Sequence, residues 1–358
     1  MIHGGNIDKI SRQLKVPSHK LLDFSANLNP LGVPGELKDT LLESLKEIRY
    51  YPDPEYVQLR TAIARYHKVD LQTVFVGNGA VQLIFEIANA LSYGHGLVLA
   101  PTFSEYEHAL KRAHVQVHHY CLREENNFQL VMTDLIAYLR LHSEIKTIYL
   151  ANPNNPTGNL ITIADLKKLV VFCNQNQRYL ILDEAFINLV CTKNSSYGPF
   201  LNINDNVFIV YSATKFFAIP GLRLGYCLVK NPKLQKLLVA QIEPWSVNIL
   251  AARFGAEMFQ AKDYIQKTNQ WFTKQQPLLY QQLKSLSALK VYPSTTNFFL
   301  FQCSQLNLKN KLLDYKIMIR QCEDYYGLGP NYFRVALRNA AENKYLIKCL
   351  HQCLEKGK

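Results

Sequence analysis

The chain has 358 residues, of which 48% are hydrophobic and 19% charged, and its formal net charge is +12. This composition is typical of folded globular proteins, and no apolar run approaches the roughly 20 residues that a membrane-spanning helix needs. The first residues also lack the apolar core of a signal peptide. The eight cysteines form no CxxC motif. We therefore expect a cytoplasmic protein with reduced thiols, no membrane partner and no metal.

The positive charge has several explanations, among them a nucleic acid and a small anionic substrate. Lys and Arg are spread along the chain in short clusters, and no nucleic-acid-binding motif is present. A solvated basic surface accounts for most of them. We expect no nucleic-acid partner, and part of the charge could attract a phosphorylated substrate.

Strand and helix patterns alternate through the middle of the chain. Short apolar runs predict strands at 73–79, 95–101, 145–158, 178–186 and 206–215, and longer patterns predict helices at 80–91 and 164–176. The run at 145–158 is a strand that enters a long polar turn. This alternation is typical of an α/β fold with a mostly parallel sheet covered on both faces.

Each predicted strand ends in polar or turn-forming residues. These ends are residues 77–79, 101–103, 152–158, 183–184 and 212–215. In open parallel sheets a ligand binds beyond the carboxyl ends of the strands. The sequence therefore predicts that these segments converge on one site.

The last third of the chain has a different pattern. It predicts strands at 291–303 and 331–337, a helix followed by a strand at 308–322, and a closing helix at 341–357. We expect a large domain at 36–240 and a smaller α+β domain formed by 1–35 and 241–358. A substrate cleft would lie between them.

The strand ends provide what a phosphorylated pyridine aldehyde needs from a protein. Lys215 could form a Schiff base with the aldehyde, and Asp183, at a buried strand end, could pair with the ring nitrogen. An unpaired buried carboxylate is costly, and a pyridinium partner would remove that cost. The alternatives are a surface lysine and an aspartate that caps the next segment.

Five residues could form a phosphate cradle. Gly79 and Ala80 open a helix whose N–H groups point at an anion, and Ser212, Thr214 and Arg223 could complete the cradle. A plain tight turn would equally explain the glycines.

Two further residues could contact the ring of the cofactor. Phe103 could stack on it, although a core phenylalanine is the usual case. Asn155 could donate a hydrogen bond to the ring oxygen, although turn formation alone explains the many Asn, Pro and Gly residues around it.

Three motifs, NPNNPTG, LDEAF and SATKFFAIPGLRLGY, resemble those of the aspartate-aminotransferase superfamily. The resemblance covers nearly the whole chain. It implies a fold-type I transferase that depends on pyridoxal 5'-phosphate. The large domain would then hold a mostly parallel sheet of the seven-stranded type between helices.

Further motifs resemble the threonine-phosphate decarboxylase family of cobalamin biosynthesis. They are HGGN, DFSANLNPLG, YYPDPEY, PWSVN and YFRVALRNAAEN. The close relative, histidinol-phosphate aminotransferase, has a tyrosine where this chain has Phe186, and aminotransferases tend to have a glycine where it has Arg338. Both differences favour the decarboxylase.

The superfamily often has polar side chains after the GNG turn, but this chain has Ala80, Val81 and Gln82.

The resemblance also implies roles for residues outside the cofactor motifs. Arg334 would bind the substrate α-carboxylate and Arg320 its phosphate, although a surface ion pair is the common fate of an arginine. Tyr51 would reach the cofactor phosphate of a neighbouring subunit, which implies a homodimer with shared sites. The remaining substrate-binding candidates are His3, Gly4, Asn27 and Arg338.

The reaction implied is decarboxylation of a phosphorylated amino acid. L-Threonine O-3-phosphate would give (R)-1-aminopropan-2-ol phosphate, and L-serine O-phosphate would give ethanolamine phosphate. One methyl group separates these substrates, worth about 1–3 kcal/mol in a pocket. An aminotransferase of the histidinol-phosphate type is the alternative.

Overall fold

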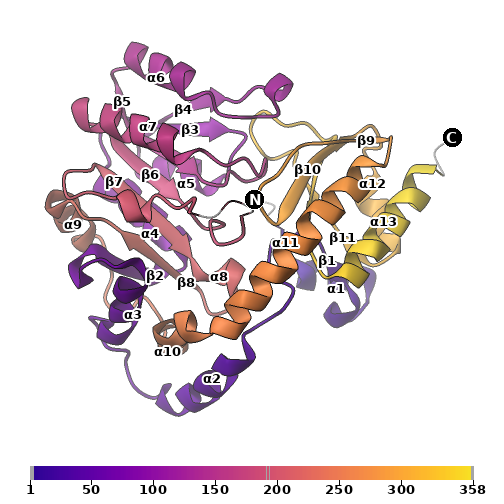
Figure 1. Cartoon of the computed structure of the whole chain (residues 1–358), viewed down its shortest axis with the longest axis horizontal. Coiled ribbons are helices and arrows are strands. Elements are labelled where there is room, and N and C mark those ends of the chain that lie inside the picture. Colours follow the sequence, from indigo (N-terminus) through magenta and orange to yellow (C-terminus); the bar gives the residue numbers. More distant parts are fainter. Residues whose placement is uncertain (1–3, 191, 193, 356–358) are drawn as a thin grey trace.

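The computed structural model describes residues 4–190, 192 and 194–355. The chain forms a large lobe built on a central sheet and a smaller lobe that contains the last third of the chain (Figure 1). Among the described residues, no helix combines the length and the apolar character needed to cross a membrane.

The large lobe contains a seven-stranded sheet with one reversed strand. β8 runs antiparallel to both of its neighbours, and the remaining pairs are parallel. The expectation of a mostly parallel sheet is confirmed. In spatial order the strands are β2 (Val74–Asn78), β8 (Leu224–Leu228), β7 (Val207–Ser212), β6 (Tyr179–Asp183), β5 (Ile145–Ala151), β3 (His95–Ala100) and β4 (Gln116–Cys121).

Helices cover both faces of this sheet (Figure 1). Alternate side chains of one strand enter different cores: Leu97 and Leu99 of β3 lie in one cluster, and Val98 lies in another. A strand buried on both faces explains the continuous apolar runs in the sequence. The helices of this lobe are α2 (Lys38–Ser44), α3 (Val57–His67), α4 (Ala80–Ala90), α5 (Glu105–Arg112), α6 (Met132–Leu141), α7 (Ile163–Gln175), α8 (Ala213–Phe216), α9 (Pro232–Val239) and α10 (Ile249–Glu257).

The small lobe combines both ends of the chain. β1 (Leu22–Asp23) pairs in parallel with β11 (Ile317–Met318), so the N-terminal segment packs against the last third of the chain. A four-stranded sheet has the order β12 (Arg320–Gln321), β13 (Tyr332–Ala336), β10 (Phe298–Cys303) and β9 (Leu289–Val291). The helices of this lobe are α1 (Ile7–Leu14), α12 (Leu308–Asp314) and α13 (Ala340–Glu355).

The two lobes are joined by α11 (Lys262–Lys284), which runs from one to the other (Figure 1). Before it, α10 packs against α2 and α3, and Phe254 and Met258 belong to the core of the large lobe. We therefore place the domain boundary within α11 rather than at residue 240.

Candidate active site

A cavity of about 700 Å³ lies between the lobes, at the carboxyl ends of the central strands. Both lobes line it, as the sequence predicts for a substrate cleft. Twelve of the predicted site residues are among its lining: Gly4, Asn27, Ala80, Phe103, Asn155, Asp183, Ser212, Thr214, Lys215, Arg223, Arg320 and Arg334.

Lys215 lies in the short helix α8, directly after β7. Burial and, to a lesser extent, the nearby Arg223 and Arg334 lower the pKa of its ammonium to about 8, while Asp183 partly opposes them. A lowered pKa provides the neutral amine that nucleophilic attack on an aldehyde requires. The surroundings of Lys215 therefore suit the formation of a Schiff base.

The reactivity of Lys215 in the cofactor-free protein should follow this lowered pKa. Below pH 8 the neutral fraction falls about tenfold per pH unit, and above pH 8 it levels off. We expect trace acetylation of Lys215 to show a midpoint near pH 8, measured by mass spectrometry. A lysine model compound in the same mixture should titrate near its ordinary value of about 10.4. Coincident profiles for the two amines would contradict the assignment.

Asp183 ends β6, and its carboxylate is buried. Tyr106 donates its hydroxyl to Oδ2 at 2.7 Å, and the Ala185 N–H donates to Oδ1 at 2.8 Å. Burial raises the pKa of this carboxyl, while those two hydrogen bonds and the charge of Lys215 oppose the rise. A protonated ring nitrogen would provide the cationic partner that favours the charged carboxylate.

The N-terminal part of α4 also borders the cavity, because Ala80 and Val81 line it. Gly79 has φ +80, and a Cβ there would lie 2.6 Å from Arg223 Nη2. The guanidinium therefore packs directly on the backbone of the helix start. No side chain caps α4, so its first N–H groups are available to an anion.

Two hydroxyl groups also belong to the cavity lining. Ser212 Oγ and Thr214 Oγ1 lie 2.7 Å apart and both residues line the cavity. Gly225 of β8 approaches so closely that a Cβ would lie 2.3 Å from the Ala80 nitrogen. Backbone N–H groups, two hydroxyls and a guanidinium fit a phosphate. Gln82 accepts from the Asn78 N–H and donates to Glu86, so its amide is already engaged.

Aromatic and amide side chains also line the cavity. Phe103 lies in the loop after β3, and its ring contacts Tyr106 edge-on at 5.6 Å between centroids. Phe186 also lines the cavity and packs edge-on against Phe298 at 5.1 Å. An apolar wall beside a buried carboxylate and a phosphate cradle is the arrangement that pyridoxal phosphate requires. The residues present fit this cofactor.

The small lobe supplies two buried arginines. Arg334 of β13 donates to Asn155 Oδ1, to the Tyr325 hydroxyl and to the Ser25 carbonyl, the last at 2.8 Å. Its Nε has no partner among the described residues. Arg320 of β12 is paired with Asp324. Both arginines line the cavity, so they are not the surface ion pairs that remained an alternative.

The remaining predicted residues differ in position. Asn27 is buried in the cavity wall, and its Oδ1 has no partner among the described residues. Gly4 lines the cavity, while His3 lies outside the described residues. Tyr51 does not line the cavity of its own chain: its side chain is 81% exposed and its ring lies 5.0 Å from that of Trp245.

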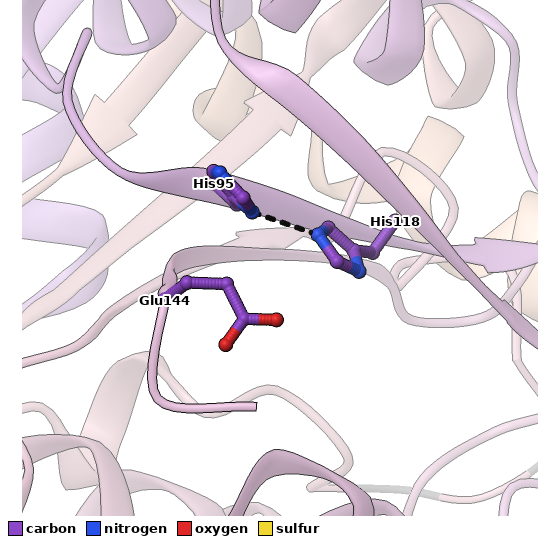
Figure 2. Close-up of side chains that lie close together, drawn as sticks. All are labelled: His95, His118 and Glu144. Carbon is purple, nitrogen blue, oxygen red and sulfur yellow. Dashed lines mark hydrogen bonds between the residues drawn. The ribbon is translucent and has the colours of Figure 1, made fainter. Parts of the chain in front are cut away.

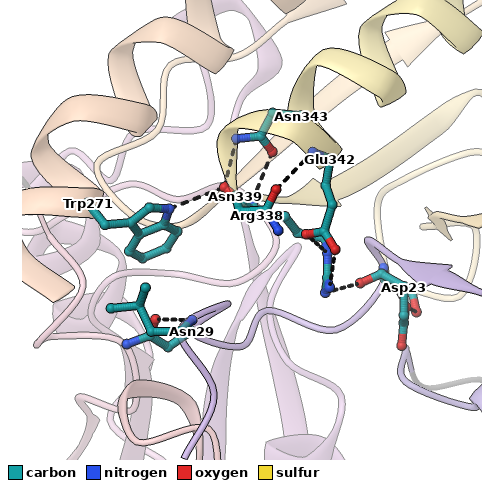
Figure 3. A network of polar contacts seen from close by, with 9 residues as sticks. Asp23, Asn29, Trp271, Arg338, Asn339, Glu342 and Asn343 are labelled. Atoms are coloured by element: carbon teal, nitrogen blue, oxygen red, sulfur yellow. Dashed lines mark hydrogen bonds and ion pairs between the residues drawn. The ribbon is translucent and has the colours of Figure 1, made fainter. Parts of the chain in front are cut away.

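The prediction that Arg338 binds the substrate is not supported by the structure, because Arg338 does not line the cavity. Its guanidinium pairs with Glu342 and donates to the Asp23 carbonyl (Figure 3). The backbone of Arg338 is also fixed, because its N–H donates to Asn343 Oδ1. Arg338 thus ties the start of α13 to β1 behind the cavity.

Sequence reasoning missed three side chains of the site. Tyr106 donates to Asp183, Tyr325 contacts Arg334, and Asp324 holds Arg320. Tyr106 lies three residues after Phe103, a spacing that places two side chains on one face of a helix. That spacing could have indicated Tyr106 as a site residue. Tyr325 and Asp324 lie in a segment with no periodic pattern.

Comparison with known proteins agrees with this geometry. Residues 19–350 match the family described as Aminotransferase class I and II. The chain is 38% identical to threonine-phosphate decarboxylase of Salmonella typhimurium, with 98% of this chain and 96% of that relative covered.

Two solved structures have the same fold over 94% of this chain and all of theirs. Histidinol-phosphate aminotransferase of Clostridium acetobutylicum has a TM-score of 0.87 at 28% identity. L-Threonine-O-3-phosphate decarboxylase of Porphyromonas gingivalis has a TM-score of 0.83 at 27% identity. The fold is thus common to relatives with two different activities. The matched residues and the arrangement of the cavity together lead to one conclusion: the chain belongs to the aminotransferase class I and II family.

Proposed function

We propose that the protein is a pyridoxal-phosphate-dependent carboxy-lyase that converts L-threonine O-3-phosphate to (R)-1-aminopropan-2-ol phosphate. The observation that carries this proposal is the 38% identity to a threonine-phosphate decarboxylase over nearly the full length of both chains. Phe186 in the cavity wall supports it, because it offers no hydroxyl to the cofactor ring. The product would serve as the linker of the cobamide nucleotide loop.

The cavity can bind both anionic groups of such a substrate. Arg334 and Arg320 line the cavity from the small lobe, and Lys215 and Asp183 line it from the large lobe. Arginine binds carboxylate and phosphate through paired N–H groups, so two arginines can fix the rotation of the substrate about Cα. Decarboxylation requires the bond from Cα to the carboxylate to stand perpendicular to the ring, whereas transamination requires the Cα–H bond there.

When bound, pyridoxal phosphate accepts the electron pair that remains at Cα when CO₂ leaves. Asp183 stabilises the proton on the ring nitrogen. Lys215, as an ammonium, would donate a proton to Cα, where a C–H bond replaces the broken bond to the carboxylate. The apolar side chains of Phe103 and Phe186 would form part of the cavity wall around this step.

An assay of CO₂ release tests the proposal against the aminotransferase alternative. Threonine phosphate, serine phosphate and histidinol phosphate would be compared side by side, with keto acids as amino acceptors. We expect stoichiometric CO₂ from threonine phosphate. Histidinol phosphate has no carboxylate, so turnover of it can appear only as a keto product. Keto product without CO₂ release from any substrate would overturn the proposal. Higher kcat/KM on serine phosphate would move the substrate assignment to that compound.

Replacement of Arg320 by glutamine should raise KM for threonine phosphate about 10- to 100-fold, because a charge-assisted contact with the phosphate is lost. The replacement should also reduce the preference for threonine phosphate over threonine. Arg320→Lys keeps the charge but loses the paired N–H groups. Its KM for threonine phosphate should therefore lie between that of the unchanged protein and that of Arg320→Gln.

The matched control for this experiment is Arg12→Gln, which changes an exposed arginine of α1 in the same lobe. Steady-state kinetics of CO₂ release measure all three variants. An unchanged KM in Arg320→Gln would contradict the assignment of Arg320 to the substrate phosphate.

We also propose that the enzyme is a homodimer with shared sites. Tyr51 and Trp245 are exposed in the single chain, as are Leu42, Leu45 and Ile48 of the nearby N-terminal segment of the large lobe. Burial of these side chains against a second copy would place Tyr51 at the neighbour's phosphate cradle. Sedimentation at the mass of one chain, 41.1 kDa, would contradict this.

The cytoplasm is the compartment that we propose. Its support is chemical: Cys121, Cys173, Cys227, Cys303, Cys322, Cys349 and Cys353 are all free thiols in the described part of the chain. Proteins of reducing compartments keep such thiols. Recovery of the protein outside the cytoplasm in cell fractionation would contradict the proposal.

A further inference from the structure

Three potential metal ligands meet at the end of the sheet that faces away from the active site. His95 is the first residue of β3, His118 lies in β4, and Glu144 lies in the turn before β5. One ligand atom from each residue lies within 4.8 Å of those of the other two. Figure 2 shows the two imidazole rings facing each other, with the Glu144 carboxylate beside them.

Strand pairing fixes this arrangement. His95 pairs with Gln116 of β4, so His118 is its diagonal neighbour two residues along the same face. On the other side His95 pairs with Ile145, and its N–H donates to the Glu144 carbonyl at 2.9 Å. His95 and His118 therefore belong to two paired strands, and Glu144 lies directly before the third strand, where its carbonyl is tied to His95.

The two rings are close enough to share one ion. His95 Nδ1 and His118 Nε2 lie 2.9 Å apart. Two nitrogens that each lie about 2.0–2.1 Å from one tetrahedral zinc ion are separated by roughly 3.3 Å. A shift of a few tenths of an ångström, a small rotation of the rings and movement of the shared proton to the other nitrogen of its ring would therefore convert the hydrogen-bonded pair into a pair of ligands.

The charge state of the cluster also suits a cation. At 2.9 Å the two rings cannot both carry a proton on the facing nitrogens, so at least one is a free acceptor. Glu144 adds a negative charge, and its Oε1 lies 2.9 Å from His142 Nδ1.

We propose that His95, His118 and Glu144 bind a divalent transition-metal ion, zinc being the best match to two imidazoles and a carboxylate. A water molecule or His142 would fill the fourth position. Metals of this class combine with neutral imidazole and carboxylate, and geometry selects among them. The sequence predicted no metal because the cysteines show no ligand spacing, and this site uses none of them.

The position of the site indicates what the ion does. The three residues lie at the amino ends of β3, β4 and the turn before β5, whereas the cavity lies at the carboxyl ends of the strands. The ion would not reach the substrate. It would instead connect the edge strand β4 to its neighbours and stabilise that edge of the sheet.

The test uses the full chain with its cofactor, freed of metal by a chelator and then titrated with zinc chloride. Isothermal titration calorimetry and elemental analysis should give one zinc ion per chain with micromolar or tighter affinity. His118→Ala should weaken binding about 100-fold or more, because loss of a ligand costs at least as much as loss of a supporting group. Zinc should raise the melting temperature of the unchanged protein but not of this variant.

His119→Ala is the matched control. His119 is the next residue of the same strand, faces the other way and contacts Glu107 Oε2 at 3.1 Å. It should keep full zinc affinity. Glu144→Gln is a second variant, for use if His118→Ala does not fold, because it keeps the shape of the side chain. It is also expected to weaken zinc binding. The proposal would be overturned if the unchanged protein took up no zinc. It would also be overturned if His118→Ala or Glu144→Gln took up as much zinc as the unchanged protein.

Discussion

Replacement of Lys215 by alanine is expected to lower kcat for CO₂ release at least about 10³-fold. The variant loses the amine that attaches the cofactor and the group that protonates Cα, and either role alone is worth several orders of magnitude. The lowered pKa of Lys215, about 8, shows how strongly its surroundings favour reactivity. Steady-state kinetics and borohydride reduction of the holoenzyme measure the two roles separately.

The control for this experiment is Lys233→Ala, which changes an exposed lysine in the first turn of α9. Both variants should keep the melting temperature of the unchanged protein to within a few degrees. In the control and in the unchanged protein, borohydride should attach the cofactor at Lys215. Covalent attachment in Lys215→Ala would show that another amine carries the cofactor.

Replacement of Asp183 by asparagine is expected to lower kcat about 10³-fold. The amide has nearly the same shape but no charge, so a protonated ring nitrogen loses its partner in a site where burial makes that partner valuable. Cofactor content should fall less than kcat, because the phosphate cradle of the variant is intact. Absorbance titration and CO₂ release provide the two measurements.

Tyr106→Phe separates the charge of Asp183 from its positioning. This variant removes the 2.7 Å hydrogen bond to Oδ2 and leaves the carboxylate in place. Its kcat should fall about tenfold, far less than that of Asp183→Asn. If the two variants were equally impaired, the charge of Asp183 would not be the essential property.

Much of the site could be predicted because it is tied to strand ends. Asp183 is the last residue of β6, and Lys215 follows β7. These strands are parallel neighbours, so the topology alone brings the two residues to one edge. The strands themselves were predictable because burial on both faces requires continuous apolar runs. β4 was not predicted, since it is an edge strand with half-exposed polar side chains. β8 was not assigned because its residues overlap the lysine and arginine motif.

Arg338 shows why the direction of a side chain near the end of a strand is hard to predict from sequence. In a strand, residues two apart share a face, so Arg338 would face the cavity with Arg334 if β13 continued. β13 ends at Ala336, and the next residues turn into α13. The guanidinium is then directed to Glu342 and the Asp23 carbonyl. A two-residue change of direction decides the role of this side chain, and no local pattern predicts it.

The tight contact between Gly225 and the start of α4 limits how this protein can diversify. A Cβ on Gly225 would lie within 2.3 Å of the Ala80 nitrogen, and one on Gly79 would lie within 2.6 Å of Arg223. These two backbone positions therefore tolerate almost no side chain. The arginines and tyrosine of the small lobe are side-chain contacts that point mutations can exchange one at a time. New substrates are thus accessible to evolution, natural or directed, through the small lobe, while the cofactor is effectively fixed.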